Sequence, residues 1–176
     1  MANAHAIRAK ALVNLGDLAT AEAALCLALA TYRRMGEPQL LVTTLVLLAE
    51  VALERGDPPA AAAWVNEAGR HEPDTVRAEL LAQLEVTRAW VRAESGDPDG
   101  ASVALGAALE AADRSPRTAV APILATVGRV EALLGRTELA TDRLAAAEAA
   151  LRASGLGPGS ALGLAVRDLR RALIRA

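Results

Sequence analysis

Few residues in this sequence could carry out acid–base, nucleophilic or metal chemistry. The chain has two histidines, His5 and His71, one cysteine, Cys26, and one lysine, Lys10. Catalysis needs acid, base or nucleophilic groups held together, and a metal site needs several ligands at fixed spacing. His5 stands near an end of the chain and His71 in a linker, so both are interpreted as solvated side chains. No glycine-rich phosphate loop with a lysine is present. The sequence therefore predicts no enzyme, no cofactor and no metal site.

The cysteine also predicts no special chemistry. A single Cys26 cannot form an internal disulfide, and it stands between Leu25 and Leu27 in a helical stretch. We expect it to be a small buried apolar residue in a reducing compartment. The opening residues, Met1 to Lys10, are polar and alanine-rich rather than a secretory signal, so a cytoplasmic location is expected.

Acidic residues beside prolines, at Asp57-Pro58 and Asp97-Pro98-Asp99, could be mistaken for an acidic site. They are better explained as helix caps. In Arg55-Gly56-Asp57, glycine can end one helix in the left-handed conformation and aspartate can cap the amides that open the next. The same joint recurs at Gly16, Gly96 and Gly135, so the four glycines are 40, 40 and 39 residues apart. This spacing indicates an internal repeat.

Alignment on the four glycines shows a repeated packing pattern. Alanine stands five and twelve residues after each glycine, an aliphatic residue nine after, and a small residue seven before. The positions five, nine and twelve residues after the glycine lie on one helical face. They predict a seam where paired helices approach closely. The alanines are Ala21, Ala61, Ala101, Ala140, Ala28, Ala68, Ala108 and Ala147; the aliphatic residues are Leu25, Val65, Leu105 and Leu144; the small residues are Ala9, Ala49, Ala89 and Gly128.

This order of a small residue, Gly-Asp, alanine, aliphatic residue and alanine resembles the tetratricopeptide repeat (TPR) over nearly the whole chain. The ordinary repeat has about 34 residues, whereas these segments have about 40, which predicts longer helices. The third repeat departs from the family by carrying Glu85, Arg88 and Arg92 where large apolar residues are usual. Long repeats rich in Ala, Leu and Arg are similar to the MalT-like region of large bacterial LuxR-type regulators.

The resemblance implies an all-α fold, a right-handed α-solenoid of about four antiparallel helix pairs plus a C-terminal capping helix, about nine helices in total. We expect one domain over residues 1–176, with repeats at about 1–36, 38–72, 74–115 and 117–154 and the capping helix at 160–175. The predicted helices before that cap are 2–15, 18–34, 38–55, 58–69, 75–94, 98–113, 117–134 and 137–153.

Several helix boundaries depend on single residues. Asp74 or Thr75 is expected to cap the fifth helix, and Thr137 is expected to cap the eighth because Arg136 replaces the aspartate of the other joints. Pro122 marks either a later start of its helix or a kink. In the last helix, Leu162, Val166, Leu169 and Leu173 are expected to face inward, and Arg167, Asp168, Arg170 and Arg171 outward. That helix is interpreted either as a cap or as the first half of a fifth repeat.

A candidate binding surface follows from the resemblance, because the first helix of each TPR pair lines a concave groove. Six residues before each joint glycine stand Lys10, Glu50, Trp90 and Arg129. Trp90 is the sharpest candidate, since tryptophan is enriched at binding hot spots; the alternative is a core residue between helices. Trp64 is expected to pack or to lie on the outer side. The predicted groove residues are Trp90, Glu50, Arg129, Lys10, Thr43, Gln83, Val46, Val86, Glu54 and Glu94.

Composition narrows the classes of partner. Aromatic residues make up only 2% of the chain, which offers few platforms for stacking bases, and the net charge of −2 gives no basic footprint for a phosphate backbone. We therefore expect no direct nucleic-acid binding. The longest apolar run, residues 40–53, contains Glu50 and is shorter than the roughly 20 residues of a membrane span. It predicts a buried helix and no membrane partner.

The favoured function is non-catalytic recognition of a protein, a peptide or a small-molecule effector in the groove, as the sensor or interaction region of a bacterial transcriptional regulator. The alternatives are a structural module that self-assembles, for example as a homodimer, and a stand-alone adaptor. An enzyme would require a cofactor or a metal to copurify.

Overall fold

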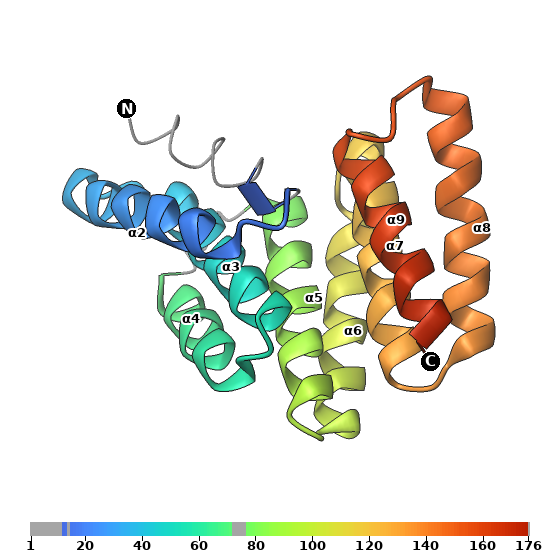
Figure 1. Cartoon of the computed structure of the whole chain (residues 1–176), viewed down its shortest axis with the longest axis horizontal. Helices are drawn as coiled ribbons and strands as arrows, with labels where there is room; N and C mark the ends of the chain where they lie inside the picture. The colour runs from blue at the N-terminus through green and yellow to red at the C-terminus, as the bar shows by residue number, and fades with distance from the viewer. Residues whose placement is uncertain (1–11, 14, 72–76, 176) are drawn as a thin grey trace. The chain divides into compact units, whose positions relative to one another are not determined.

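The architecture is described from a computed structural model, which describes residues 12–13, 15–71 and 77–175 (Figure 1). Within these residues the chain forms helices and turns and no strand, so the all-α prediction is confirmed. The chain divides into two compact units, Met1–Val76 and Arg77–Ala176, which are described separately. Most of the helix expected at 2–15, with His5, Ala9 and Lys10, lies outside the described residues. One domain over 1–176 stays a prediction.

In the first unit, two of the three described helices pack on a central one. They are α2 (Leu18–Met35), α3 (Pro38–Glu54) and α4 (Pro58–Arg70). The apolar α3 packs against both α2 and α4, which explains why nearly its whole circumference is buried, Leu45 and Ala49 completely so. The prediction that the run at 40–53 forms a buried helix is confirmed.

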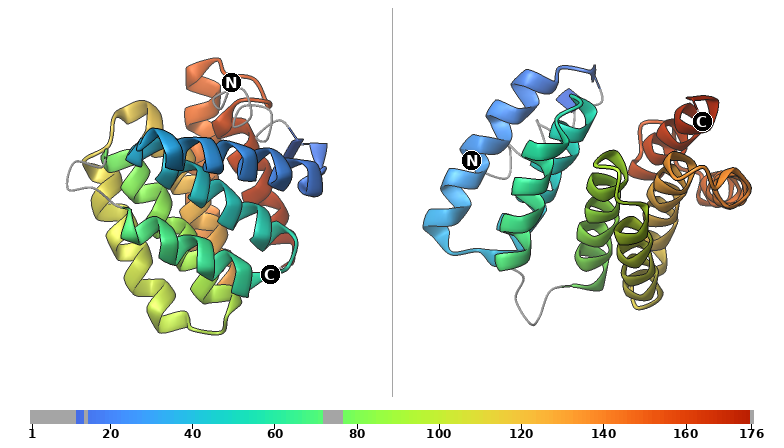
Figure 2. Two further views of the ribbon diagram at one scale, coloured as in Figure 1. Left: turned by 90° about the vertical axis from the view of Figure 1, so that its left-hand side faces the viewer. Right: turned by 90° about the horizontal axis from the view of Figure 1, so that it is seen from below.

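The second unit contains two helix pairs and a final helix. Its helices are α5 (Ala78–Glu94), α6 (Pro98–Asp113), α7 (Arg117–Leu133), α8 (Thr137–Ser154) and α9 (Ala161–Arg175). We call α3, α5, α7 and α9 the A helices, and α2, α4, α6 and α8 the B helices. In this unit α5 and α7 each pack on their own B helix and on the next A helix, and α6 and α8 each pack on the following A helix (Figures 1 and 2). This contact order is that of TPR-like repeats.

The joints between paired helices form as their residue types require. Gly56 takes a φ of 73°, in the left-handed region that a side chain resists, and the three other joint glycines do likewise. The aspartates after the first three glycines cap the next helix by accepting an amide hydrogen bond. The bonds run from the Thr20 amide to Asp17 (3.2 Å), from the Ala60 amide to Asp57 (3.0 Å) and from the Gly100 amide to Asp97 (2.8 Å).

Some capping predictions differ from the structure. At the fourth joint Arg136 occupies the capping position without a side-chain cap, and Thr137 is already the first helical residue, so the Thr137 cap is wrong. Helix α5 begins at Ala78 with Arg77 in the capping position, later than the start predicted at residue 75; the proposed caps Asp74 and Thr75 lie outside the described residues. Helix α7 begins at Arg117, so Pro122 stands inside it rather than at its start.

The alanine seam is confirmed by burial. All eight alanines at offsets five and twelve are at most 3% exposed, and the aliphatic residues Leu25, Val65 and Leu105 are at most 4% exposed. Leu144, the fourth aliphatic position, is only partly buried and packs beside Ala140 and Ala147. Alanine allows the paired backbones to approach closely, and the branched residue fills the space beside them.

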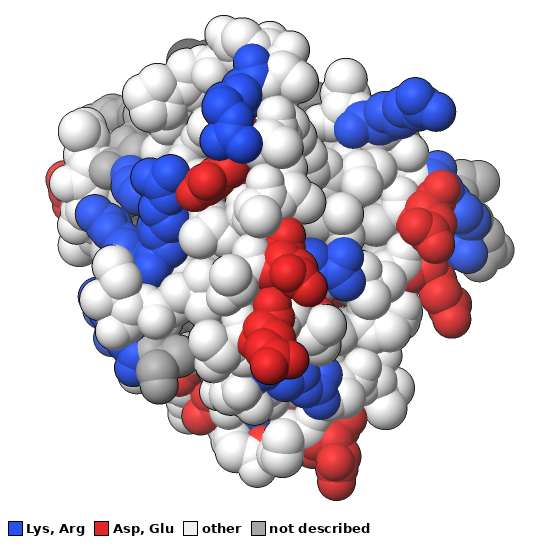
Figure 3. All heavy atoms as spheres, turned by 90° about the vertical axis from the view of Figure 1, so that its right-hand side faces the viewer, with Lys and Arg blue, Asp and Glu red and all other residues white. Residues whose placement is uncertain are grey.

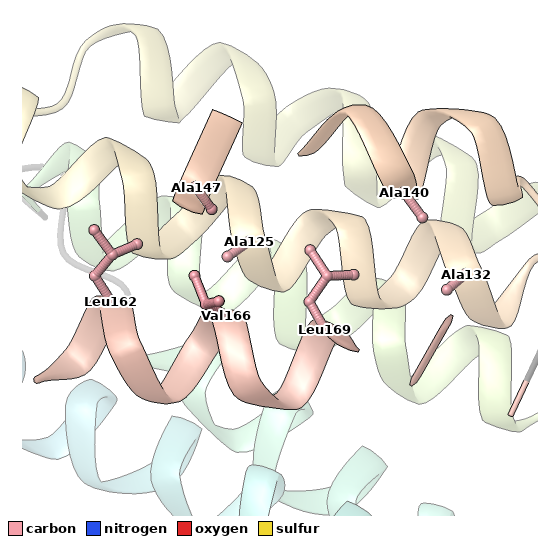
Figure 4. Close-up of a cluster of buried hydrophobic side chains, with 7 residues drawn as sticks. All are labelled: Ala125, Ala132, Ala140, Ala147, Leu162, Val166 and Leu169. Carbon is pink, nitrogen blue, oxygen red and sulfur yellow. The ribbon is translucent and has the colours of Figure 1, made fainter. Parts of the chain in front are cut away.

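Helix α9 covers α7 and α8 with one apolar face. This face buries Leu162, Val166 and Leu169 against alanines of the two helices, which are Ala125 and Ala132 of α7 and Ala140 and Ala147 of α8 (Figure 4). The Ser160 hydroxyl caps α9 by accepting the Gly163 amide at 3.1 Å. The inward face of this helix is therefore confirmed, with Leu173 partly buried beside it.

The charged residues of the third repeat are accommodated by partners. Glu85 is buried and forms an ion pair with Arg88 one helical turn away. The Arg92 guanidinium donates a hydrogen bond to the Gly100 carbonyl at 3.0 Å, which links α5 to the start of α6. Polar partners thus replace the apolar packing that is usual at these positions.

Cys26 differs from the prediction because it is exposed. It is adjacent in sequence to the buried Leu25, but one step of 100° around α2 carries it off the buried face. Leu27, one step before the buried Ala28, is 59% exposed for the same reason. Partial burial of the thiol raises the pKa of Cys26, and the Glu22 charge raises it further. The thiol is therefore largely protonated near neutral pH.

Candidate functional site

The predicted groove residues lie on three A helices. Helix α3 carries Thr43, Val46, Glu50 and Glu54; α5 carries Gln83, Val86, Trp90 and Glu94; and α7 carries Arg129. Lys10 lies outside the described residues. Since α3 belongs to the first unit and α5 and α7 to the second, the surface is described as two separate parts.

Burial divides these residues into two groups. Val46, Val86 and Trp90 are at most 3% exposed, so they are core side chains rather than contact residues. Gln83, Glu54 and Glu94 are exposed, and Thr43, Glu50 and Arg129 are partly exposed. The polar residues of the row are thus the ones accessible to a partner.

Trp90 forms a local cluster between α5 and α7. The Arg129 guanidinium lies 3.7 Å from the centre of the indole ring, and the indole Nε1–H donates to Glu94 Oε1 at 3.2 Å. A guanidinium over an indole face is held by the ring quadrupole, and the hydrogen bond satisfies the only donor of the indole. Trp90 therefore fixes the positions of an exposed carboxylate and a partly exposed guanidinium.

Of the two interpretations of Trp90, a groove contact or a core residue between helices, its burial supports the core residue. The register was sound, because Trp90 and Arg129 stand at the same offset and are in contact. The ring is buried because a long side chain on the neighbouring A helix covers it. Trp64, on α4, is half-buried.

A buried carboxylate on α7 was not found by sequence reasoning. Glu131 is 4% exposed, and its Oε2 has no hydrogen-bond partner among the residues that the structure describes. The Nε atom of Arg143 on α8 lies 3.6 Å from that oxygen, close enough for charge attraction but longer than a hydrogen bond. Burial raises the pKa of Glu131, and the Arg143 and Arg136 charges offset this only in part.

Arg143 also explains why glycine stands at position 128, in the seam of the fourth repeat. A methyl group on Gly128 would lie 2.8 Å from Arg143 Cβ and 3.0 Å from Leu169 Cδ2. Alanine stands at this offset in the other repeats, and alanine or tryptophan stands where this repeat has Arg143. Glycine therefore lets α7 approach the arginine stem on α8 and the leucine on α9.

Other chemistry is not assembled in the described ranges. Among those residues no three His, Cys, Asp or Glu side chains are placed to hold a metal ion. None of the helices described is both long and apolar enough to cross a membrane. Thus the site that remains is a polar helical surface.

The helix pairs, the glycine joints and the contact order of the second unit are consistent with an α-solenoid of TPR-like repeats. A family model for the tetratricopeptide repeat matches residues 2–25 and 42–67. Both matches begin 14 residues before a joint glycine, at Gly16 and Gly56, so they share the register of the alanine seam. Repeats of this family generally mediate protein–protein interaction and are typically non-catalytic. No curated protein and no solved structure matches the chain.

Proposed function

We propose that this protein is a non-catalytic recognition module that binds a protein or peptide through the polar residues of its A helices. The observation that carries the proposal is the match to an interaction repeat in the same register as the α3–α4 pair. In TPR modules the A helices carry contact residues; here α3 exposes Glu54 in the first unit, and α5 exposes Gln83 and Glu94 in the second.

The finer proposal places this module in the sensor region of a bacterial transcriptional regulator, in the cytoplasm. The repeat length near 40 residues and the excess of arginine over lysine support it. A small-molecule effector is the second ligand class, and the cluster of Trp90, Arg129 and Glu94 supports it by fixing two charged groups side by side. Nucleic acid is not a proposed ligand.

Self-assembly is the alternative function, and one observation favours it. The B helices expose large apolar side chains: Leu27 on α2 is 59% exposed, Val103 on α6 is 72% exposed and Leu139 on α8 is 49% exposed. Isolated exposed apolar residues are common, but large exposed apolar side chains can also contribute to a homodimer contact. Light scattering over a range of concentrations separates the functions, because a recognition module stays monomeric and a self-assembly module does not.

A capture experiment with two matched double variants tests the proposed surface. The A-helix variant is Glu54→Arg with Gln83→Arg, and the control is Glu110→Arg with Asn66→Arg on B helices. Each double variant replaces one carboxylate and one amide, with one substitution in each unit. All four positions are exposed. Both chains should retain their helical circular dichroism.

Proteins captured from a lysate of the source organism are then compared by quantitative mass spectrometry. The proposal predicts a partner that the parent chain and the control retain and the A-helix variant loses. Equal loss in both variants, or equal retention, would place binding elsewhere.

A further inference from the structure

Helix α9 carries the largest net positive charge of the described helices. Burial of Leu162, Val166 and Leu169 fixes how this helix is turned, so its charged residues lie on the opposite side. Helix α9 has four arginines and one aspartate, a net charge of +3 by this count, in a chain whose net charge is −2. A local positive charge of this size within an acidic protein indicates a binding surface.

Two carboxylates organise the arginines. Glu148 of α8 accepts a hydrogen bond from Arg170 Nε at 2.9 Å. The same carboxylate forms ion pairs with Arg170 Nη2 at 2.7 Å and with Arg152 at 3.9 Å. Asp168 accepts a bond from Arg167 at 2.9 Å and lies 3.9 Å from Arg171. We call these six residues the α8–α9 arginine cluster: Arg152, Arg167, Arg170 and Arg171 with Glu148 and Asp168.

The cluster keeps an excess of positive charge in solvent. Four guanidiniums share two carboxylates, which leaves a net charge of +2. The side chains of Arg152, Arg170 and Arg171 are 73%, 59% and 63% exposed. Figure 3 views the side of the molecule on which α8 lies in Figure 1, and basic side chains gather along one edge of that face.

The geometry of these side chains fits carboxylates. A guanidinium presents five N–H donors in a planar fork and binds carboxylates in a bidentate manner. Arg152 and Arg171 are too far from their carboxylates to hydrogen-bond to them, at 3.9 Å. Both guanidiniums are mostly exposed, so their N–H donors remain available to an incoming carboxylate.

A phosphate backbone fits the cluster less well. Glu148 and Asp168 stand between the arginines, where they would face a continuous row of negative charges, and the chain as a whole is acidic. Nucleic-acid affinity grows with the number of phosphates neutralised, and an excess of two charges is small for that purpose. A short segment with spaced carboxylates can place its charges on the exposed guanidiniums alone.

We propose that the α8–α9 arginine cluster docks an acidic segment of a partner protein, whose carboxylates are bound by Arg152, Arg170 and Arg171. This surface is distinct from the polar residues of α3 and α5, so the two proposals can fail separately.

Fluorescence anisotropy with a labelled decaglutamate peptide tests this inference. The 176-residue chain is titrated into the peptide at about 20 mM and about 150 mM salt, since attraction between exposed charges weakens with ionic strength. A double variant, Arg170→Ala with Arg171→Ala, is compared with Arg114→Ala plus Arg117→Ala. The control removes the same charge from exposed arginines outside the cluster, and thermal melts check that both variants fold.

The inference predicts binding at low salt that weakens at higher salt, and a loss of about tenfold in affinity for the cluster variant, against less than about twofold for the control. Absence of binding at low salt, or equal loss in both variants, would overturn it. So would tighter binding of a labelled single-stranded oligonucleotide than of the peptide. A dimer in light scattering that the cluster variant abolishes would identify a second copy of the chain as the occupant instead.

Discussion

The same substitution, glycine to alanine inside a helix, should have opposite effects at two positions of the second unit. Gly128 in α7 faces Arg143 and Leu169, and a methyl group there would lie 2.8 Å from Arg143 Cβ. Gly106 in α6 is exposed, and a methyl group there would meet no atom within 4 Å. Gly106→Ala is therefore the matched control for Gly128→Ala.

The magnitudes follow from two competing terms. Alanine stabilises a helix interior relative to glycine by about 0.5–1 kcal/mol, and both variants gain this. At Gly128 the contact at 2.8 Å is with a Cβ atom close to the backbone, so the helices must move apart, and overpacking costs about 1–3 kcal/mol. Gly106→Ala should stabilise the second unit, and Gly128→Ala should range from neutral to destabilised by about 2 kcal/mol.

Urea unfolding followed by tryptophan fluorescence measures the difference in the correct unit. In a Trp64→Phe background the remaining tryptophan is Trp90, which lies in the same unit as both glycines. The free energies of unfolding of the two variants should differ by about 1–3 kcal/mol. If Gly128→Ala stabilises this unit as much as Gly106→Ala does, then α7 and α8 do not approach as closely as described, and the explanation for glycine in the fourth repeat fails.

Three further substitutions test other parts of the structure. Ala101→Leu should destabilise the chain by about 1–3 kcal/mol because it overpacks the seam, whereas Ala149→Leu on the exposed side of α8 should not; equal thermal melts would refute the register. Trp90→Ala should cost about 3–5 kcal/mol because the indole is buried, and a variant that melts like the parent would show instead that the ring is accessible. Because the pKa of Glu131 is raised, the folded state binds the proton of this carboxyl more tightly than the unfolded state does. This proton therefore contributes fully to the free energy of unfolding below the ordinary pKa near 4.5, and the contribution is lost as pH rises through the folded-state pKa. Glu131→Gln should remove that loss from a urea-midpoint series across pH, with Glu138→Gln on the exposed surface as control; superimposable profiles for Glu131→Gln and the parent would contradict it.

The helix boundaries and the seam could be predicted because local chemistry determines them. Gly56 must end its helix in the left-handed region, Asp57 must cap the next one, and an alanine such as Ala61 is required where backbones nearly touch. Each of these constraints depends on residues close in sequence and is repeated in other copies. Predicted and observed helix boundaries consequently differ by at most one residue, except at the start of α5.

The side-chain environment of the site could not be predicted in the same way. Burial of Trp90 depends on how Arg129 on the next A helix crosses the ring, and sequence spacing does not specify a rotamer. Burial of Glu131 had a signal that was missed: the fourth repeat alone has glycine at the position of Gly128 and a charged residue at the position of Arg143. Two departures within one repeat, beside the carboxylate of Glu131, indicate that the residues compensate one another.

The central claim is that the A helices carry the recognition surface, and hydrogen–deuterium exchange tests it most directly. Exchange is measured on the chain alone and in complex with the partner that the capture experiment identifies. The claim predicts slower exchange in α3 and α5, the helices that carry Glu54 and Gln83, with little change in α4 and α6. Protection confined to the B helices, or to α9 alone, would contradict it.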